Sequence, residues 1–233
     1  MPLRAILFDK DGTLVDFDKT WGAAIFHAMQ ALARDEAQMA RLAEAIDYDL
    51  PRRRIRPHSP LVAGSTGDYA GLWAKPLERI PDDAFVAELD QLCITYSLRD
   101  VAPIGDPRAV LVGLKQAGFR VGVLTNDSER GARGQCEKLG LAEMLDVIVG
   151  YDSGHGRKPA PDPLHAIADM LGIDPTDMAL VGDSLHDLHA ARAAGSIGIG
   201  VLSGHADAAM LAPHADHVID DIMSLPPLIE RIG

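Results

Sequence analysis

The stretch Leu3–Asp16, which reads LRAILFDKDGTLVD, is the part of the sequence from which we predict the fold. It opens with an apolar run, Ala5–Phe8, that suits a strand buried on both of its faces. Two carboxylates, Asp9 and Asp11, follow the run, and a Gly-Thr turn pair follows them. Because ligands bind beyond the carboxyl ends of parallel strands, we expect these acids to mark a functional site. The alternative is an edge turn, in which Asp and Gly are ordinary residues.

The rest of the chain shows two different patterns. Residues 17–101 contain helical spacings and loops, one of them the glycine-rich stretch Gly64–Gly71, and no strand pattern. From residue 102 onward, helices alternate with short apolar runs, and a closing helix spans Asp221–Ile232, shortened or interrupted by two prolines. The expected strands are Arg120–Leu124, Leu145–Val149, Met178–Val181, Ile197–Val201 and a weak one at His217–Ile219.

This alternation predicts the fold class. Strands joined by helices imply right-handed crossovers, and therefore an α/β fold with a doubly wound parallel sheet. Residues 1–16 and 102–233 would form this α/β core, and residues 17–101 would be an all-helical domain inserted after the first strand. Because the insertion begins soon after Asp9 and Asp11, we expect it to act as a cap over them.

Composition narrows the class of protein. The chain has 233 residues, 47% of them hydrophobic, which suits one α/β domain that carries a smaller one. Its formal net charge of -12 argues against a general nucleic-acid or anionic-membrane surface. No apolar run approaches the ~20 residues that span a bilayer, and the start of the chain leaves no room for a signal peptide. With Cys93 and Cys136 interpreted as buried, reduced thiols, we expect a cytoplasmic protein.

Polar residues end two of the later strands and occupy the loop between them. Thr125 and Asn126 follow one strand, and Asp183 follows another, with Asp187 one helical turn further on. Lys158 lies before a proline in the intervening loop. If the strands are parallel neighbours of the first one, all of these side chains gather at one edge of the sheet.

Four carboxylates at one sheet edge need a cation. Two unit charges about 4 Å apart repel by roughly 4 kcal/mol at an effective dielectric constant near 20. The acids could take up protons instead, but Mg²⁺ is the simpler solution because it prefers oxygen ligands and pairs with phosphate. Lys158 adds a positive charge, and Thr125 and Asn126 can donate hydrogen bonds to phosphoryl oxygens. Asp9 and Asp11 could then divide covalent attack from acid–base work.

Together these motifs resemble those of the haloacid dehalogenase superfamily of phosphohydrolases. Asp9–Leu14, DKDGTL, is similar to the family's first motif, DxDGT, and Gly182–Asp187 is similar to its fourth, GDSxxD. Thr125 with Asn126 looks like the second motif, and Lys158 before a proline looks like the third. The order and approximate spacing also fit, so the resemblance covers essentially the whole chain. The insertion corresponds to the helical cap of the phosphoglycolate-phosphatase-like subgroup.

The resemblance implies catalytic roles. Asp9 would attack phosphorus and form an aspartyl-phosphate. Asp11 would protonate the leaving alcohol and then activate water for hydrolysis of that intermediate. Thr125 and Asn126 would bind the phosphoryl group, and Lys158 would offset the charge on it and on Asp9.

The resemblance also implies a metal site. Mg²⁺ would be held by Asp9, by the backbone carbonyl of Asp11 and by Asp183. Asp187 would lie close by and orient Lys158 or a metal-bound water. Dehalogenation is not expected, because the dehalogenating members lack the acid at Asp11 and need no metal.

Lys10 departs from the family pattern, in which many members have an apolar residue at this position. If the segment stays extended, the Lys10 side chain should point away from both Asp9 and Asp11.

We therefore predict an Mg²⁺-dependent phosphomonoester hydrolase acting on a small phosphorylated metabolite, with phosphoglycolate as the leading substrate. The arginines of the cap would bind the substrate's second anionic group or form a solvated turn; they are Arg52, Arg53, Arg54 and Arg56. One alternative is a sugar phosphomutase of the same superfamily. Another is a non-enzymatic, receiver-like phosphoacceptor, although receiver domains are shorter and lack an insertion after the first strand. We expect a monomer or homodimer with no nucleic-acid or membrane partner.

Overall fold

The computed structural model describes residues 3–62 and 64–232. The chain divides into two compact units: unit 1 holds the described residues of Met1–Asp16 and Pro103–Gly233, and unit 2 holds those of Phe17–Ala102. Residues 1, 2 and 233, which we assigned to the α/β core, lie outside the described residues. Within the described ranges, no helix is both long and apolar enough to cross a membrane.

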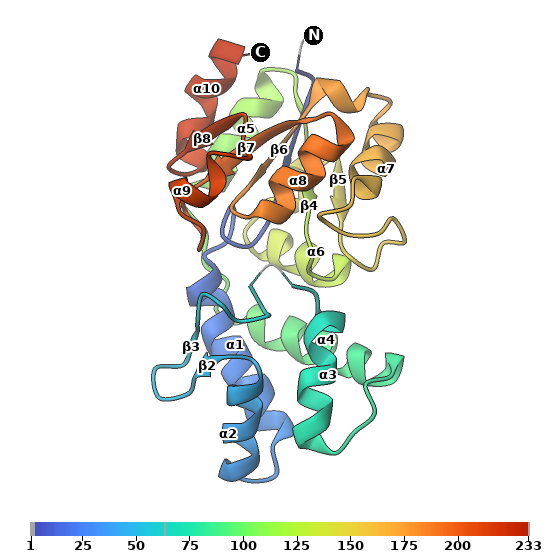
Figure 1. The fold of residues 1–233 in the computed structure, drawn as a ribbon. Coiled ribbons are helices and arrows are strands. Elements are labelled where there is room, and N and C mark those ends of the chain that lie inside the picture. Colours follow the sequence, from blue (N-terminus) through green and yellow to red (C-terminus); the bar gives the residue numbers. More distant parts are fainter. Residues whose placement is uncertain (1–2, 63, 233) are drawn as a thin grey trace. The chain divides into compact units, whose positions relative to one another are not determined.

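Unit 1 is built on a parallel sheet (Figure 1). Its strands are β1 (Ala5–Phe8), β4 (Arg120–Leu124), β5 (Val147–Val149), β6 (Met178–Gly182), β7 (Ile197–Val201) and β8 (His217–Ile219). They pair in the order β5-β4-β1-β6-β7-β8, and each of these pairings is parallel. In the middle, Phe8 lies opposite Val123 of β4 on one side and Val181 of β6 on the other. The predicted doubly wound parallel sheet is confirmed.

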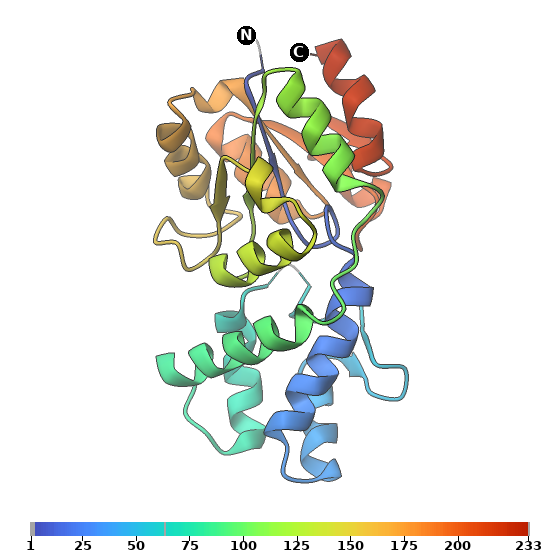
Figure 2. The same ribbon diagram turned by 180° about the vertical axis from the view of Figure 1, so that it is seen from behind.

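Helices cover both faces of this sheet. They are α5 (Pro107–Gln116), α6 (Glu129–Lys138), α7 (Asp162–Leu171), α8 (Leu185–Ala194), α9 (Ala208–Leu211) and α10 (Leu225–Ile232), with short 3-10 turns η1 (Ala142–Met144), η2 (Pro175–Asp177) and η3 (Ile222–Ser224). Helices α7 and α8 pack on one face (Figure 1), and α5 and α10 pack on the other (Figure 2). On the first face, Leu7 and Leu180 share an apolar cluster with Ile167. Burial of each such side chain contributes roughly 1.5–3 kcal/mol and holds the central strands in place.

Unit 2 is mainly helical. Its helices are α1 (Phe17–Leu32), α2 (Glu36–Ala45), α3 (Thr66–Leu77) and α4 (Asp83–Ser97). Trp73 lies in the apolar core of this unit, and its indole N–H donates a hydrogen bond to the Leu42 carbonyl at 3.1 Å. Cys93 of α4 is a buried thiol, as is Cys136 of α6 in unit 1, so both cysteines have the reduced, buried state that we expected.

Unit 2 also contains a short antiparallel ladder, so the expectation that residues 17–101 hold no strand is wrong. Strand β2 (Tyr48–Asp49) pairs with β3 (Arg54–Ile55). Strands of two residues carry too little alternation to be recognised from sequence. Ile55 is fully buried, whereas Arg54 beside it is exposed, so the ladder anchors the arginine-rich stretch to the core of unit 2.

The glycine-rich stretch Gly64–Gly71 is not a loop throughout. Helix α3 begins at Thr66, and Ser65 and Asp68 form a capping box at its start. Capping satisfies amides at the helix end that have no intrahelical partner, and this offsets the low helix propensity of the glycines.

The last helix is shorter than the predicted range. Helix α10 begins at Leu225, so Pro226 and Pro227 fall in its first turn. A missing N–H is tolerated there because amides of the first turn have no intrahelical acceptor. Asp221 instead caps the turn η3, where its side chain accepts a hydrogen bond from the amide of Met223 at 2.8 Å.

Candidate active site

Strand β1 ends where the functional residues begin. All of its residues are buried, and Asp9, the next residue, is 8% exposed. The chain then turns sharply, because the Lys10 carbonyl accepts hydrogen bonds from the amides of Leu14 at 2.8 Å and Val15 at 2.9 Å. Gly12 has a φ of 76°, a conformation that favours glycine. This turn keeps Asp9 at the carboxyl edge of the sheet.

Three carboxylates converge at this edge. Oxygen atoms of Asp9, Asp183 and Asp187 lie within 4.8 Å of one another. Asp183 directly follows β6, the neighbour of β1, and Asp187 lies in the first turn of α8. A Cβ atom at Gly12 or at Gly204 would overlap the Asp183 carboxylate, so the close approach requires glycine at both positions. The structure thus brings together three of the four acids that the motifs single out.

Lys158 lies between two of these acids. Its Nζ is 2.7 Å from Asp9 Oδ1 and donates to Asp187 Oδ1 at 2.6 Å, and the residue is 3% exposed. The side chain of Asn126 holds the backbone of Lys158 from both sides: Nδ2 donates to the Lys158 carbonyl at 3.0 Å, and Oδ1 accepts from the Lys158 amide at 3.1 Å. Asn126 therefore positions the Lys158 loop, and its predicted binding of a phosphoryl group stays a prediction for the second N–H of the amide.

Thr125 stands at the end of β4, on the other side of β1 from Asp183. It is 2% exposed, and its amide donates to the Val149 carbonyl at 3.0 Å. Its Oγ1 accepts a hydrogen bond from the amide of Asp127 at 3.1 Å. The hydroxyl is therefore oriented as an acceptor from the chain, and its own proton can be donated to a phosphoryl oxygen.

Burial and mutual repulsion raise the pKa values of two acids in the cluster. Burial raises the pKa of Asp9 to about 7, with Lys158 opposing the shift and Asp187 adding to it. The pKa of Asp183 is raised well above its usual range by burial and by the charges of Asp9 and Asp187. Burial opposes the charge on Lys158, but Asp187 and Asp9 outweigh it and raise the pKa of the ammonium. One ammonium does not balance the acids around it.

The donor set suits a hard divalent cation. Asp9, Asp183 and Asp187 offer carboxylate oxygens, the ligands that Mg²⁺ prefers. The raised pKa values of Asp9 and Asp183 indicate an excess of negative charge, which a divalent cation would relieve. The residues therefore fit the predicted Mg²⁺, and the backbone carbonyl of Asp11 stays a predicted ligand.

Asp11 belongs to a different group of charges. Its Oδ2 accepts a hydrogen bond from Lys10 Nζ at 2.6 Å. Lys10 is fully buried, and its Nζ also donates to Gln135 Oε1 at 2.9 Å and lies 3.2 Å from Asp127 Oδ2. The expectation that Lys10 points away from Asp11 is wrong. The strand ends at Phe8, and the tight turn that follows brings the lysine back to the acid.

Sequence reasoning missed several residues of this edge. Asp127 directly follows the second motif, so its carboxylate could have been noticed as a further acid at the end of β4. Gln135 is fully buried inside α6, and nothing in the helix pattern marks it. Ser203, whose hydroxyl donates to the Gly12 carbonyl at 2.8 Å, is separated from the first motif by most of the chain.

The four arginines lie on or beside the β2–β3 ladder of unit 2, and each is exposed and has a partner in that unit. Arg52 pairs with Asp49 at 3.1 Å, Arg54 with Asp18 at 2.7 Å and Arg56 with Asp47 at 3.1 Å, and the Arg53 guanidinium stacks 3.9 Å from the ring centroid of Phe26. Ion pairs this exposed are weak because water screens the charges.

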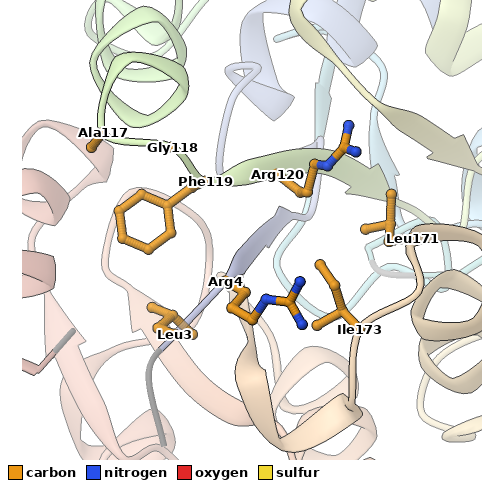
Figure 3. A pocket seen from close by; sticks show the side chains of 8 residues that line it. All are labelled: Leu3, Arg4, Ala117, Gly118, Phe119, Arg120, Leu171 and Ile173. Atoms are coloured by element: carbon orange, nitrogen blue, oxygen red, sulfur yellow. The ribbon is translucent and has the colours of Figure 1, made fainter.

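A separate cavity of about 230 Å³ lies at the amino ends of β1 and β4, the opposite edge of the sheet (Figure 3). Its lining includes Arg4, Phe119 and Arg120. The Arg120 guanidinium is already paired with Asp146 at 2.8 Å. Because the predicted functional residues do not line this cavity, the carboxyl edge remains the candidate active site.

Comparisons with known proteins agree with this geometry. A family model described as haloacid dehalogenase-like hydrolase matches residues 3–195. The chain is 39% identical to a phosphoglycolate phosphatase of Neisseria meningitidis, over 99% of this chain and 94% of the relative. It is 31% identical to a phosphoglycolate phosphatase of Shigella boydii, over 87% of this chain and 82% of the relative.

Solved structures share the fold. CbbY from Rhodobacter sphaeroides, solved in complex with phosphate, has a TM-score of 0.72 at 22% identity, over 96% of each chain. β-Phosphoglucomutase from Clostridium difficile has a TM-score of 0.71 at 16% identity, over 98% of this chain and 96% of that one. At these identities the likeness establishes the fold alone. The family model and the two relatives confirm what the motifs predict: the chain belongs to the haloacid dehalogenase-like hydrolases and is a phosphatase of that family.

Proposed function

We propose that the protein is an Mg²⁺-dependent phosphomonoester hydrolase that forms an aspartyl-phosphate on Asp9, and that its substrate is phosphoglycolate. The observation that carries the mechanism is the position of Lys158, 2.7 Å from Asp9 and 2.6 Å from Asp187 within the carboxylate cluster. A nucleophile, a fixed ammonium and a set of oxygen ligands for a divalent cation then share one sheet edge. The substrate is suggested by the names of the two relatives.

In the first step, an Asp9 carboxylate oxygen attacks phosphorus while the bond from phosphorus to the leaving oxygen breaks. Asp11 gives its proton to that oxygen, so the product leaves as a neutral alcohol. Lys158 offsets charge on the phosphoryl oxygens, and the Thr125 hydroxyl donates a hydrogen bond to one of them. Asn126 acts indirectly, because it holds the backbone of Lys158.

In the second step, a water molecule attacks the phosphorus of the aspartyl-phosphate. Asp11, now a carboxylate, takes a proton from the water, and the bond between phosphorus and Asp9 breaks. Inorganic phosphate leaves, and both acids return to their starting states. Mg²⁺ would be held by Asp9 and Asp183, with Asp187 beside them, and would supply charge stabilisation for the transferred group.

Steady-state release of phosphate tests the proposal. With Mg²⁺, we expect many turnovers of phosphoglycolate, at a higher kcat/KM than for other small phosphomonoesters. The Asp9→Asn variant should release no phosphate above background, and EDTA should stop turnover until Mg²⁺ is restored. No release from any phosphomonoester would contradict the hydrolase assignment. Release from other esters but not from phosphoglycolate would contradict the substrate alone.

The same assay separates the alternatives. A sugar phosphomutase would interconvert isomers of a sugar phosphate without net release of phosphate, and its fold is available, since β-phosphoglucomutase shares it. A receiver-like phosphoacceptor would take up phosphate once and would not turn over.

We further propose that unit 2 selects the substrate, and that one or more of its four arginines bind the substrate carboxylate. Because their ion pairs are exposed, a substrate carboxylate can replace the aspartates. A screen of phosphorylated metabolites with each arginine changed to Ala tests this assignment, and an unchanged preference in all four variants would contradict it. The cytoplasmic location and the monomeric or dimeric state stay predictions.

A further inference from the structure

The proposed chemistry leaves one buried ammonium without a role. Lys10 is 0% exposed, although it stands between the two acids of the first motif. Three oxygens surround its Nζ: Asp11 Oδ2 at 2.6 Å, Gln135 Oε1 at 2.9 Å and Asp127 Oδ2 at 3.2 Å. Asp11 and Gln135 accept hydrogen bonds from this ammonium, and Asp127 adds an opposite charge beside it. This arrangement holds Lys10 in one position.

The two neighbours of Lys10 other than Asp11 belong to the segment that leads into α6 and to α6 itself. Asp127 Oδ1 accepts a hydrogen bond from the amide of Ser128 at 2.7 Å, and its other oxygen lies towards Lys10. Gln135 is buried inside α6, whose start is capped by the Ser128 hydroxyl. Lys10 therefore connects the turn after β1 to helix α6 and to the residue that precedes its N-cap.

The Asp11 side chain is the partly exposed member of this contact. It is 18% exposed in a turn, whereas the Lys10 side chain is 0% exposed. A charge-assisted bond of 2.6 Å restricts the rotation of the carboxyl group. Asp11 can offer Oδ2 as an acceptor with or without a proton on its other oxygen, so the bond can persist through both proposed steps.

We propose that Lys10 is a positioning residue for Asp11: by holding Oδ2, it keeps the carboxyl group in the orientation from which it protonates the leaving oxygen. This inference rests on the proposed function, because it needs Asp11 as the general acid. The competing explanation is that Lys10 only ties α6 to β1 and contributes to folding. The two explanations differ in whether the loss of kcat/KM on removal of Lys10 should depend on the basicity of the leaving group.

The test compares two leaving groups in the Lys10→Met variant. A proton donor matters for the basic alkoxide of phosphoglycolate and little for the leaving group of 2,4-dinitrophenyl phosphate. The value of kcat/KM reports only the steps up to departure of the alcohol or phenol. The later hydrolysis of the aspartyl-phosphate therefore does not affect it. We expect kcat/KM to fall at least ~30-fold for phosphoglycolate and less than ~3-fold for the aryl ester; the first loss approaches the 10²–10⁴-fold that a general acid typically contributes. Equal losses for both esters would overturn the positioning role.

Two further variants serve as references. Asp11→Asn sets the largest difference between the esters that loss of the acid can produce. Lys115→Met is a matched control, since it also removes a lysine–aspartate contact of unit 1, from Lys115 Nζ to Asp146 at 2.8 Å. It should affect both esters alike.

If Lys10→Met does not fold, the Gln135→Met variant decides. It removes a neutral acceptor of Lys10 and keeps the charged groups Lys10, Asp11 and Asp127. We expect a loss about 3-fold larger for the alkyl ester than for the aryl ester, the size of one hydrogen bond. A loss independent of the leaving group would overturn the inference.

If the wild-type protein turns over neither ester, it is the proposed function that fails. If phosphoglycolate alone is inert, the best alkyl phosphate of the substrate screen replaces it.

Discussion

Each of the two acids of the first motif contacts a different lysine, and the two lysines come from different parts of the chain. Lys158 comes from a loop between β5 and α7 and lies 2.7 Å from Asp9. Lys10 comes from the motif itself and lies 2.6 Å from Asp11. Both lysines are buried, at 3% and 0% exposure. The sheet edge therefore carries two charge clusters, each with its own ammonium.

The two clusters differ in whether they can bind a further charged group. Around Lys158 the acids outnumber the ammonium, and the raised pKa values of Asp9 and Asp183 indicate negative charge that a further cation would compensate. Around Lys10 the acids also outnumber the ammonium, since Asp11 and Asp127 both lie beside it, but this group holds two carboxylates and a neutral amide oxygen from Gln135 rather than three convergent carboxylates. The first cluster suits binding of metal and phosphate, and the second suits the fixing of one side chain.

Of the changes that test whether the two clusters act separately, removal of the Lys158 ammonium should have the largest effect on activity. We expect Lys158→Met to lower kcat/KM roughly 10²–10³-fold, because a fixed charge beside the transferred phosphoryl group is removed. The loss should be equal for alkyl and aryl esters, since the charge on the phosphoryl group does not depend on what leaves. Measurement of kcat/KM with both esters checks this. A loss confined to alkyl esters would show that the two clusters do not act separately.

Loss of Lys10 should affect stability as well. In Lys10→Met, the buried Oδ2 atom of Asp127, whose side chain is 11% exposed, is left without its ammonium, which we expect to lower the free energy of unfolding by roughly 3 kcal/mol. The double variant Lys10→Met/Asp127→Asn should regain part of that loss, because one buried charge is removed with its partner. Urea unfolding of the two variants measures the difference. A double variant no more stable than the single one would argue against Asp127 as the counter-charge.

The Lys158 cluster should make metal binding dependent on pH. In the metal-free protein, the pKa of Asp9 is raised from 3.8 to about 7. Between these pH values the folded protein holds a proton that the unfolded chain has lost, so the free energy of unfolding falls as pH rises through this window. Mg²⁺ must displace that proton. We therefore expect its apparent Kd to fall at least about tenfold per pH unit between about pH 5 and 7, because Asp183, whose pKa is also raised, can hold a second proton.

Calorimetric titration of the protein with Mg²⁺ at several pH values tests this dependence. The Lys10→Met variant should show the same slope if its cluster is separate. A Kd that does not change with pH would contradict the assignment of Asp9 as a ligand that must lose a proton.

The smallest effects are expected in unit 2. Among the four arginine-to-alanine variants, at least one should raise KM for phosphoglycolate about tenfold, the size of one charge-assisted hydrogen bond, with little change in kcat. Their thermal unfolding should change little, because the ion pairs that they remove are exposed. A fall in kcat without a rise in KM would point instead to an effect on the chemistry.

The fold was largely predictable because its strands are continuous apolar runs that end in polar residues. Ala5–Phe8, Arg120–Leu124 and Ile197–Val201 have the observed bounds, because runs of four or five residues are too short for helices and typical of buried strands. The β2–β3 ladder was not predictable, since pairs of two residues carry no period. Helix α3 had a signal in its capping box, but the glycines beside it favoured a loop.

In the site, the residues that belong to motifs could be predicted and their side-chain directions could not. The motifs single out Asp9, Lys158 and Asp183, and these meet at one edge. Lys10 was misjudged because the rule of alternating directions holds only while the strand continues, and this strand stops at Phe8. Gln135 lies far along the chain, so its contact with Lys10 depends on how α6 packs, which no local pattern contains.

The order of the strands also determines how the site responds to partial unfolding. The motif acids and Thr125 follow β1, β4 and β6, which are consecutive in the middle of the sheet, whereas β8 is a half-buried strand at its edge. Proteins open first where backbone hydrogen bonds are few and exposed, so fraying begins at such edges. The amides of Ile6–Phe8 should exchange with solvent only when the whole unit opens. Thermal fluctuations that detach β8 therefore leave the nucleophile on a strand that is still fully paired.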